Sequence, residues 1–271
     1  MKKIIITTIL SIAVFGAFAQ TKKDSSTTVP DSVRRKNVNI SLSFGDDDGK
    51  HRHTDTTTYS DRAYPRFSFG ITFSRFDLGL ATLIDNGSFT LSPKNDFLRY
   101  RSWKTSNVGF DLVQMGVRFN PNFKIYLSGG FDWTLIRLRE DITILPNQPV
   151  LTYRQDNIDY SKNRFSSTYL RIPLSFDFRT NENSEGKRAH LVFGPDGGLL
   201  LGGRVKQISK EHGKQKIDDD YHFTKFRYGG FVRFGYGDLG IFAKYYFNDM
   251  FENSPDQKGL KNLSFGFTLG F

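Results

Sequence analysis

Apolar residues alternate with polar or small ones along much of the chain, most clearly in the last nine residues. In the segment LSFGFTLGF, residues 263–271, every odd position is Leu or Phe. Successive side chains of a strand point to opposite faces, so this segment predicts a strand with one wholly apolar face. Such a strand exposes a soluble protein to aggregation, whereas in a membrane β-barrel it closes the barrel and its apolar face meets lipid. The predicted lipid-facing residues of this closing strand are Leu263, Phe265, Phe267, Leu269 and Phe271.

Seven further alternating segments precede the closing strand, so the predicted number of strands is eight. In the first of them the apolar phase changes between Phe73 and Phe76, which predicts a bulge or a second short segment. The strands are expected at residues 66–80, 103–119, 123–135, 169–178, 191–202, 227–236, 239–248 and 263–271.

The connections between these segments alternate in length. Tight turns are expected at 120–122, 181–187 and 235–238. Long polar loops are expected after residue 80 and at 139–163, 206–222 and 251–259. Outer-membrane barrels have long outer loops and short periplasmic turns. The pattern therefore predicts an all-β fold, an eight-stranded antiparallel up-and-down transmembrane β-barrel over residues 66–271, with its C-terminus on the periplasmic side.

The N-terminal segment predicts export. Lys2 and Lys3 precede an apolar run over residues 4–18, and Ala17-Phe18-Ala19 has the form of a cleavage site. These features are typical of a signal peptide over residues 1–19. The alternative, a membrane-anchoring helix, needs a longer apolar run of about 18 residues or more. Residues 20–65 are polar and predict a mostly flexible periplasmic extension, in which 38–44 alternates and could form one strand.

Composition and charge support a membrane setting. The chain holds 27 Phe, 12 Tyr and 2 Trp, no Cys, and a formal charge of +10, or +8 without Lys2 and Lys3 (36 basic minus 28 acidic residues). For an exported barrel we expect this charge to contact anionic outer-membrane lipid, and we expect no nucleic-acid partner. The barrel-assembly machinery is expected to bind the C-terminal strand. A periplasmic or secretion-machine partner is a further possibility that the extension leaves open.

Charged residues occur on the predicted inner face of the barrel. An eight-stranded barrel is just wide enough for side chains to fill it, and unpaired charges there would be costly. We therefore expect a salt-bridged plug, with an ion or solute pathway as the alternative. The predicted lumen charge network consists of Lys124, Asp132, Arg171, Asp177, Asp196, Arg227, Arg233 and Lys244.

Two groups of residues contain side chains that could take part in metal binding or catalysis. His51 and His53 would share one face of a strand and could hold a transition metal, but the surrounding residues 46–57 fail the EF-hand spacing and suit a solvated linker better. His212 and His222 flank the acidic run 218–220, where an Asp and His pair could activate water or Ser209. No nucleophile is singled out by spacing, so no catalytic, cofactor or metal site is predicted and the protein is expected not to be an enzyme.

Several short strings within residues 66–271 resemble the PorT-like outer-membrane β-barrel family. The most specific of them is YLRIPL at residues 169–174. The resemblance implies an eight-stranded outer-membrane barrel, in agreement with the strand count. The family's namesake takes part in secretion across the outer membrane, but no residue here carries that role over. The other matching strings are SWK at 102–104, LSGGF at 127–131, FRYGG at 226–230, YYF at 245–247 with MF at 250–251, and the closing segment 263–271.

Overall fold

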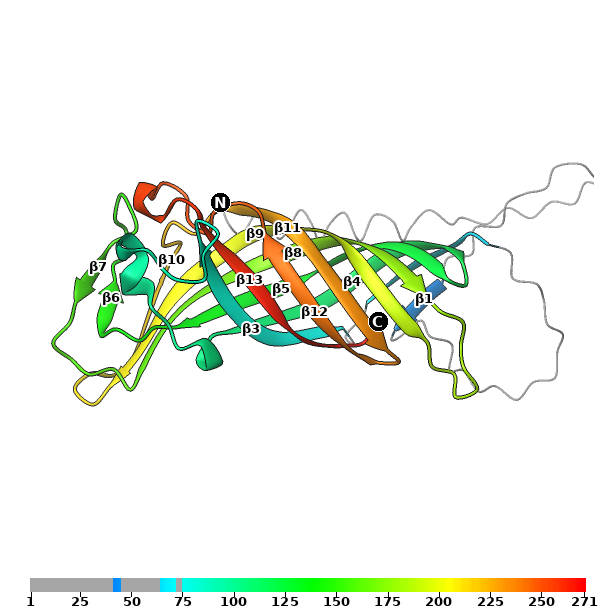
Figure 1. Cartoon of the computed structure of the whole chain (residues 1–271), viewed down its shortest axis with the longest axis horizontal. Helices are drawn as coiled ribbons and strands as arrows, with labels where there is room; N and C mark the ends of the chain where they lie inside the picture. Colours follow the sequence, from blue (N-terminus) through cyan, green and yellow to red (C-terminus); the bar gives the residue numbers. More distant parts are fainter. Residues whose placement is uncertain (1–40, 45–63, 72–74) are drawn as a thin grey trace, which may run out of the picture. The chain divides into compact units, whose positions relative to one another are not determined.

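The computed structural model describes residues 41–44, 64–71 and 75–271, with side chains in the last two ranges (Figure 1). The expected signal peptide lies outside these residues, as do His51, His53 and most of the expected extension.

Eight antiparallel positions form a closed ring, as the sequence predicted. The chain passes around the ring in order, and the last strand pairs with β3 to close it, Phe267 opposite Leu78. The strands of the ring are β2 (Arg66–Ile71) and β3 (Phe76–Asp85), which share one position, then β4 (Ser106–Asn120), β5 (Phe123–Arg137), β8 (Lys162–Arg179), β9 (Ala189–Ser209), β11 (Phe226–Tyr236), β12 (Leu239–Tyr246) and β13 (Leu260–Leu269).

The first ring position contains the predicted change of phase. Both β2 and β3 pair with β4, β2 with its second half and β3 with its first. Phe69 faces outward from β2 and Leu78 faces outward from β3, so odd positions give way to even ones between them. Strand β1 (Ser41–Phe44) pairs in parallel with β2, which confirms that one short strand lies in the segment 38–44.

The two ends of the barrel differ, and Figure 1 shows the long connections on the left and the tight turns on the right. We call these the long-loop end and the tight-turn end. Part of the expected loop 206–222 is instead a hairpin, because β9 continues to Ser209 and pairs with β10 (Gly213–Asp219). Likewise β8 begins at Lys162, and the expected loop 139–163 contains a small sheet of β6 (Ile142–Ile144) and β7 (Tyr153–Gln155).

Short 3-10 helices complete the long-loop end. Trp103, expected to begin the second long strand, lies instead in η2 (Ser102–Lys104), and its side chain is exposed. The other two are η1 (Pro93–Leu98) and η3 (Pro255–Gln257). Within the described part of the chain, no helix has the length and apolarity to cross a membrane.

Large apolar side chains cover the outside of the ring. Inside the ring, the polarity of the side chains changes along the barrel axis. Phe267 is 66% exposed and Ile241 is 55% exposed on the outer face. At the long-loop end the interior is apolar, because Phe165, Phe223 and Phe251 stack there with residues of the loops. Aromatic packing of this kind contributes to the stability of that end.

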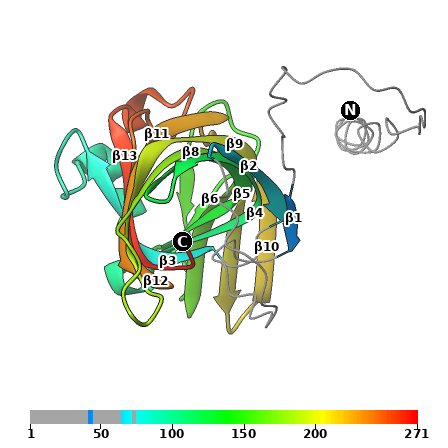
Figure 2. The same ribbon diagram turned by 90° about the vertical axis from the view of Figure 1, so that its right-hand side faces the viewer.

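Phe271 does not face lipid, contrary to the prediction. Its side chain is only 6% exposed and packs against Tyr126, Val192 and Phe231 inside the tight-turn end. In Figure 2, which views the ring from that end, the C-terminus lies inside the outline of the ring. Strand β13 ends at Leu269, and Gly270 has a φ of +76°, so the alternation stops before the last residue.

Candidate functional site: the filled lumen

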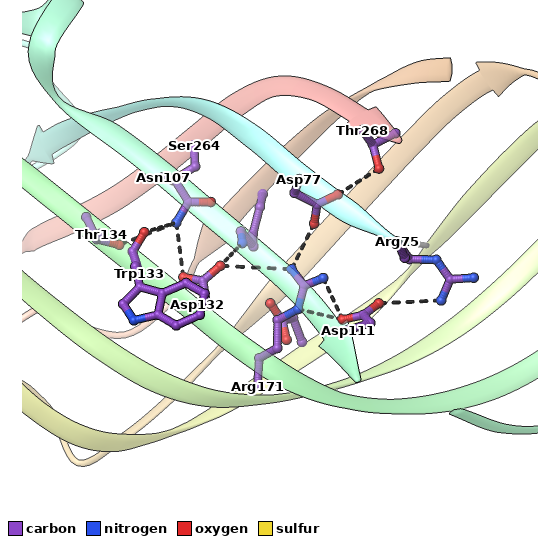
Figure 3. A network of polar contacts seen from close by, with 12 residues as sticks. Arg75, Asp77, Asn107, Asp111, Asp132, Trp133, Thr134, Arg171, Ser264 and Thr268 are labelled. Atoms are coloured by element: carbon purple, nitrogen blue, oxygen red, sulfur yellow. Dashed lines mark hydrogen bonds and ion pairs between the residues drawn. The ribbon is translucent and has the colours of Figure 1, made fainter. Parts of the chain in front are cut away.

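Arg171 of β8 lies at the centre of the lumen, where it joins carboxylates from two other strands (Figure 3). Its Nε donates to Asp111 Oδ1 at 2.7 Å, and its Nη1 donates to Asp77 Oδ2 at 2.8 Å. Asp132 Oδ2 is 3.9 Å from the same Nη1. The Arg171 side chain is 1% exposed, so its charge is desolvated and needs these carboxylates.

Asp77 is shared between two arginines and the closing strand. Arg233 of β11 donates from Nη2 to Asp77 Oδ2 at 2.7 Å, next to the Arg171 contact. The Thr268 hydroxyl of β13 donates to Asp77 Oδ1 at 2.7 Å. Arg171, Arg233 and Thr268 belong to three different strands. Asp77 of β3 therefore links its own strand to β8, β11 and β13.

Asp132 forms the second centre of the network. Arg227 Nη2 lies 2.6 Å from Asp132 Oδ1, Lys244 Nζ contacts Oδ2, and Asn107 Nδ2 donates to Oδ1 at 3.0 Å. The guanidinium of Arg227 is also sandwiched between two rings, 3.8 Å from the centroid of Tyr169 and 4.1 Å from that of Tyr246. A cation held between two aromatic faces in a desolvated site is well stabilised.

The remaining predicted members lie above or below these centres. Tyr246 donates its hydroxyl to Asp196 Oδ2 at 3.1 Å. Towards the tight-turn end, Asp177 Oδ2 accepts from Arg179 Nε at 2.7 Å. Lys124 lies 5.3 Å from the ring centroid of Tyr126. All eight residues of the predicted lumen charge network are therefore buried inside the barrel.

Three central members were missed by the sequence reasoning: Arg75, Asp77 and Asp111. Arg75 Nη1 donates to Gln114 at 2.9 Å and lies 3.4 Å from Asp111 Oδ2. Asp111 has the same parity as the outward residues that follow it, but the register between β4 and β5 shifts between Asp111 and Val113 and turns its carboxylate inward. Asp77 and Arg75 border the change of phase in the first strand, so the only available signal was that change itself.

The His and Asp residues of the long loops, for which no catalytic site is predicted, do not come together in an acid–base pair. The His222 ring bonds the carbonyl of Gln148 through Nε2 at 2.7 Å, and the Asp220 carboxylate accepts the backbone N–H of His222 rather than a ring proton. His212 is bonded through its backbone N–H to the Ser209 hydroxyl. Over residues 64–71 and 75–271, no group of three or more His, Asp or Glu side chains has the geometry to hold a metal ion.

One carboxylate of the second long connection is held in a defined set of hydrogen bonds. Asp156 accepts from Thr143 Oγ1, from Tyr160 OH at 3.0 Å and from Arg154 Nε at 2.9 Å. Burial raises the pKa of Asp156, but these hydrogen bonds outweigh it, so its pKa lies below the usual value. The ionised carboxylate therefore fastens the β6–β7 sheet to the rest of its loop.

Comparison with known proteins agrees with this architecture. No curated protein and no solved structure matches the chain significantly. The model of the outer membrane protein beta-barrel domain matches residues 18–252, most of the 271-residue chain. The closed ring, its apolar outer face and this match lead to one conclusion: the chain belongs to the outer membrane protein beta-barrel domain family and is an integral outer-membrane protein.

Proposed function

We propose that the protein is a non-enzymatic component of the outer membrane whose barrel has no open pore and whose long loops face outward. The observation that carries this proposal is Arg171, which is 1% exposed at mid-lumen and bonded to Asp77 and Asp111. The apolar packing around Phe165 fills the long-loop end, and Phe271 fills the tight-turn end. Buried side chains at both ends and at mid-lumen of an eight-stranded barrel support a barrel without a continuous water column.

Conductance in planar bilayers tests the closed lumen. The purified protein is expected to give no stable channel. A variant combining Arg171→Ala, Arg227→Ala and Phe271→Ala removes material from the central layer and the tight-turn end, and serves as the comparison for a partly opened lumen. A stable open channel in the unmodified protein would contradict the proposal.

Orientation is tested by labelling single cysteines on intact cells, since the chain has none of its own. Glu211→Cys lies in the β9–β10 connection at the long-loop end, and Ser184→Cys lies in the β8–β9 turn at the other end. With the long loops outside, a membrane-impermeant thiol reagent labels position 211 and spares position 184. The reverse pattern would show that the long loops face the periplasm.

The non-enzymatic assignment is supported by the loops, where His222 is engaged with a backbone carbonyl and has no carboxylate partner on its ring among the described residues. Incubation of the reconstituted protein with lipid extracts is expected to leave the lipids unchanged. A lipid-modifying activity that is lost in His222→Ala, and retained in His212→Ala, would overturn the assignment.

A second candidate is an accessory role in an outer-membrane transport or secretion machine, as a PorT-like protein. Its support is the parallel pairing of β1 with β2, which brings part of the N-terminal extension to the end of β4 that leads into a tight turn. Partners in the periplasm could then dock on the extension. Stoichiometric co-purification in mild detergent, lost when residues 20–40 are deleted, would favour this role over the first.

A further inference from the structure

Four basic residues stand directly opposite one another across four neighbouring strands, and we call them the basic row. Arg137 of β5 pairs with Arg164 of β8, Arg164 pairs with Lys206 of β9, and Lys206 pairs with Lys216 of β10. Adjacent strands are about 4.8 Å apart, so the row crosses about 14 Å of sheet. Like charges directly opposite each other repel, which makes this arrangement costly by itself.

More positive charge lies beside the basic row. Arg101 donates its backbone N–H to the carbonyl of Arg137 at 2.8 Å, which extends the row by one position. Lys162 and Lys214 both pair with Ile208, two residues farther along β9 than Lys206. The four residues of the basic row and these three neighbours together give seven cationic side chains on adjoining segments of the chain.

The basic row faces out of the barrel. Ile136, Phe165 and Val205 are buried in the interior, and each is the immediate neighbour of a residue of the row, whose own side chain points to the opposite face. The row is at least partly accessible, because Lys216 is exposed and the other three side chains are half-buried. An external ligand can reach it from the side of the barrel.

No carboxylate of the described residues makes an ion pair with the basic row, although the charge of Lys216 contributes, after the hydrogen bond from Arg204, to lowering the pKa of Asp218. The nearby Arg204, in contrast, pairs with Asp218 at 3.2 Å. The Nε of Arg164 is buried without a hydrogen-bond partner. The charge of Arg164 lowers the pKa of Lys162, with burial and Lys206 adding to the effect. Each cation therefore lies in the positive field of its neighbours.

The height of the basic row relative to the apolar outer face suggests what it contacts. On β5 the outward residues run from Phe123 to Leu135, and Arg137 is the next outward residue. Ten residue steps from Phe123 to Trp133, at about 3.3 Å each and tilted by about 40°, rise about 25 Å, which equals the apolar band of about 25 Å in such barrels. Trp133 therefore lies at the top of this band, and Arg137, four residues farther along β5, lies at the level of the lipid headgroups.

We propose that the basic row binds the phosphate groups of a phosphorylated glycolipid in the leaflet at the long-loop end. Arginine holds phosphate oxygens through two parallel N–H bonds, and lysine adds a point charge, so the row matches several phosphates side by side. The choice of a glycolipid of the outer leaflet rests on the proposed orientation with the long loops outside. Binding anions relieves the repulsion between the four cations.

The test uses the full chain in nanodiscs of phosphatidylcholine that contain a small fraction of a bisphosphorylated glycolipid. Native mass spectrometry measures how much glycolipid stays bound, and the same glycolipid without phosphates is the ligand control. The unmodified protein is expected to retain the phosphorylated form and release the other. The variant Arg137→Gln/Arg164→Gln/Lys206→Gln/Lys216→Gln is expected to lose retention by at least about tenfold, as multiple phosphate contacts are removed.

A matched control removes the same number of charges away from the basic row. Lys94→Gln/Lys187→Gln/Lys225→Gln/Lys258→Gln is expected to retain the glycolipid as the unmodified protein does. Equal retention by both quadruple variants and the unmodified protein would overturn the proposal. So would tight binding of soluble polyphosphate that the glycolipid does not displace, because the ligand would then not be a lipid.

Folding and orientation are checked separately. The row makes no ion pair that substitution would break, so the quadruple variant is expected to keep its heat-modifiable gel migration, and Arg164→Gln/Lys206→Gln provides a milder variant with an intermediate loss. Labelling of Glu211→Cys that placed the long loops in the periplasm would contradict the proposed orientation. It would therefore also contradict the choice of an outer-leaflet glycolipid. The retention assay in nanodiscs would still report separately whether the row binds lipid phosphate.

Discussion

The ring of Phe271 stacks on the imidazole of His190, with centroids 4.9 Å apart and an interplanar angle of 29°. Two glycines make room for it, since a Cβ added at Gly235 or Gly240 would lie 2.3 Å or 2.5 Å from the phenylalanine ring. The positive φ of Gly270 turns the chain inward at this point. The Phe271 ring therefore lies inside the tight-turn end of the barrel.

Phe271→Ala is expected to admit water-soluble reagents to that end. Val192 is 1% exposed and packs in the same cluster, so Val192→Cys gives a single protected thiol. In the Phe271→Ala background the thiol should react with a small polar maleimide several-fold faster, as measured by mass shift over time. Phe267→Ala, which alters only the outer face, is the control. Equal rates in all three proteins would mean that Phe271 does not seal the lumen.

Adjacent residues of β13 should respond differently to arginine. Phe267 is 66% exposed near the middle of the outward run of the strand, so Phe267→Arg places a charge in lipid and should cost about 2–4 kcal/mol. Thr268 is fully buried and bonded to Asp77, so Thr268→Arg acts by crowding the lumen. Urea titration of folding in lipid vesicles measures both, and Thr268→Val separates the hydrogen bond from crowding. An unchanged urea midpoint for Phe267→Arg would show that the side chain of Phe267 does not face lipid.

Sequence alternation was informative where the environment constrained both faces of a strand. Ile241 and Lys244 could be placed because lipid lies on one side of β12 and a filled lumen on the other. Beyond the apolar band, outward residues such as Arg164 and Lys206 are polar, so the pattern vanished although the strands continued. The polar pattern therefore predicts loops where the strands in fact continue.

The sequence does not show which charged side chains contact one another in the lumen. The inward parity of Arg171 could be read from β8 alone, but its contacts with Asp77 and Asp111 depend on how strands far apart in the ring are staggered. A single bulge inverted the parity of Asp111, and one left-handed glycine inverted the facing of Phe271. The irregularity in the first strand interrupts the apolar alternation of the sequence, whereas the turn at Gly270 leaves it unbroken.

Arg171→Met should be strongly destabilising, because it leaves Asp77 and Asp111 with less compensation in a desolvated site. Removal of one partner of a buried ion pair costs about 3–5 kcal/mol. A double-mutant cycle with Asp111→Asn, followed by urea unfolding in vesicles, is expected to give a coupling of about 1–3 kcal/mol. Additive effects would indicate that the contact of 2.7 Å contributes no specific stabilisation.

Protonation of Asp156 should loosen the second long connection without unfolding the barrel. Its pKa is lowered in the folded protein, so the stabilisation is present above the ordinary carboxyl pKa of about 3.9 and is lost as the pH falls from there towards the folded value. Hydrogen exchange followed by mass spectrometry should therefore show faster exchange in β6 and β7 below about pH 4, after correction for intrinsic rates. Asp156→Asn removes the charge and should show the faster exchange already at pH 7, with little further change on acidification. If the Asp156→Asn protein and the unmodified protein had the same pH profile, the hydrogen bonds from Thr143, Arg154 and Tyr160 would not be what fastens this loop.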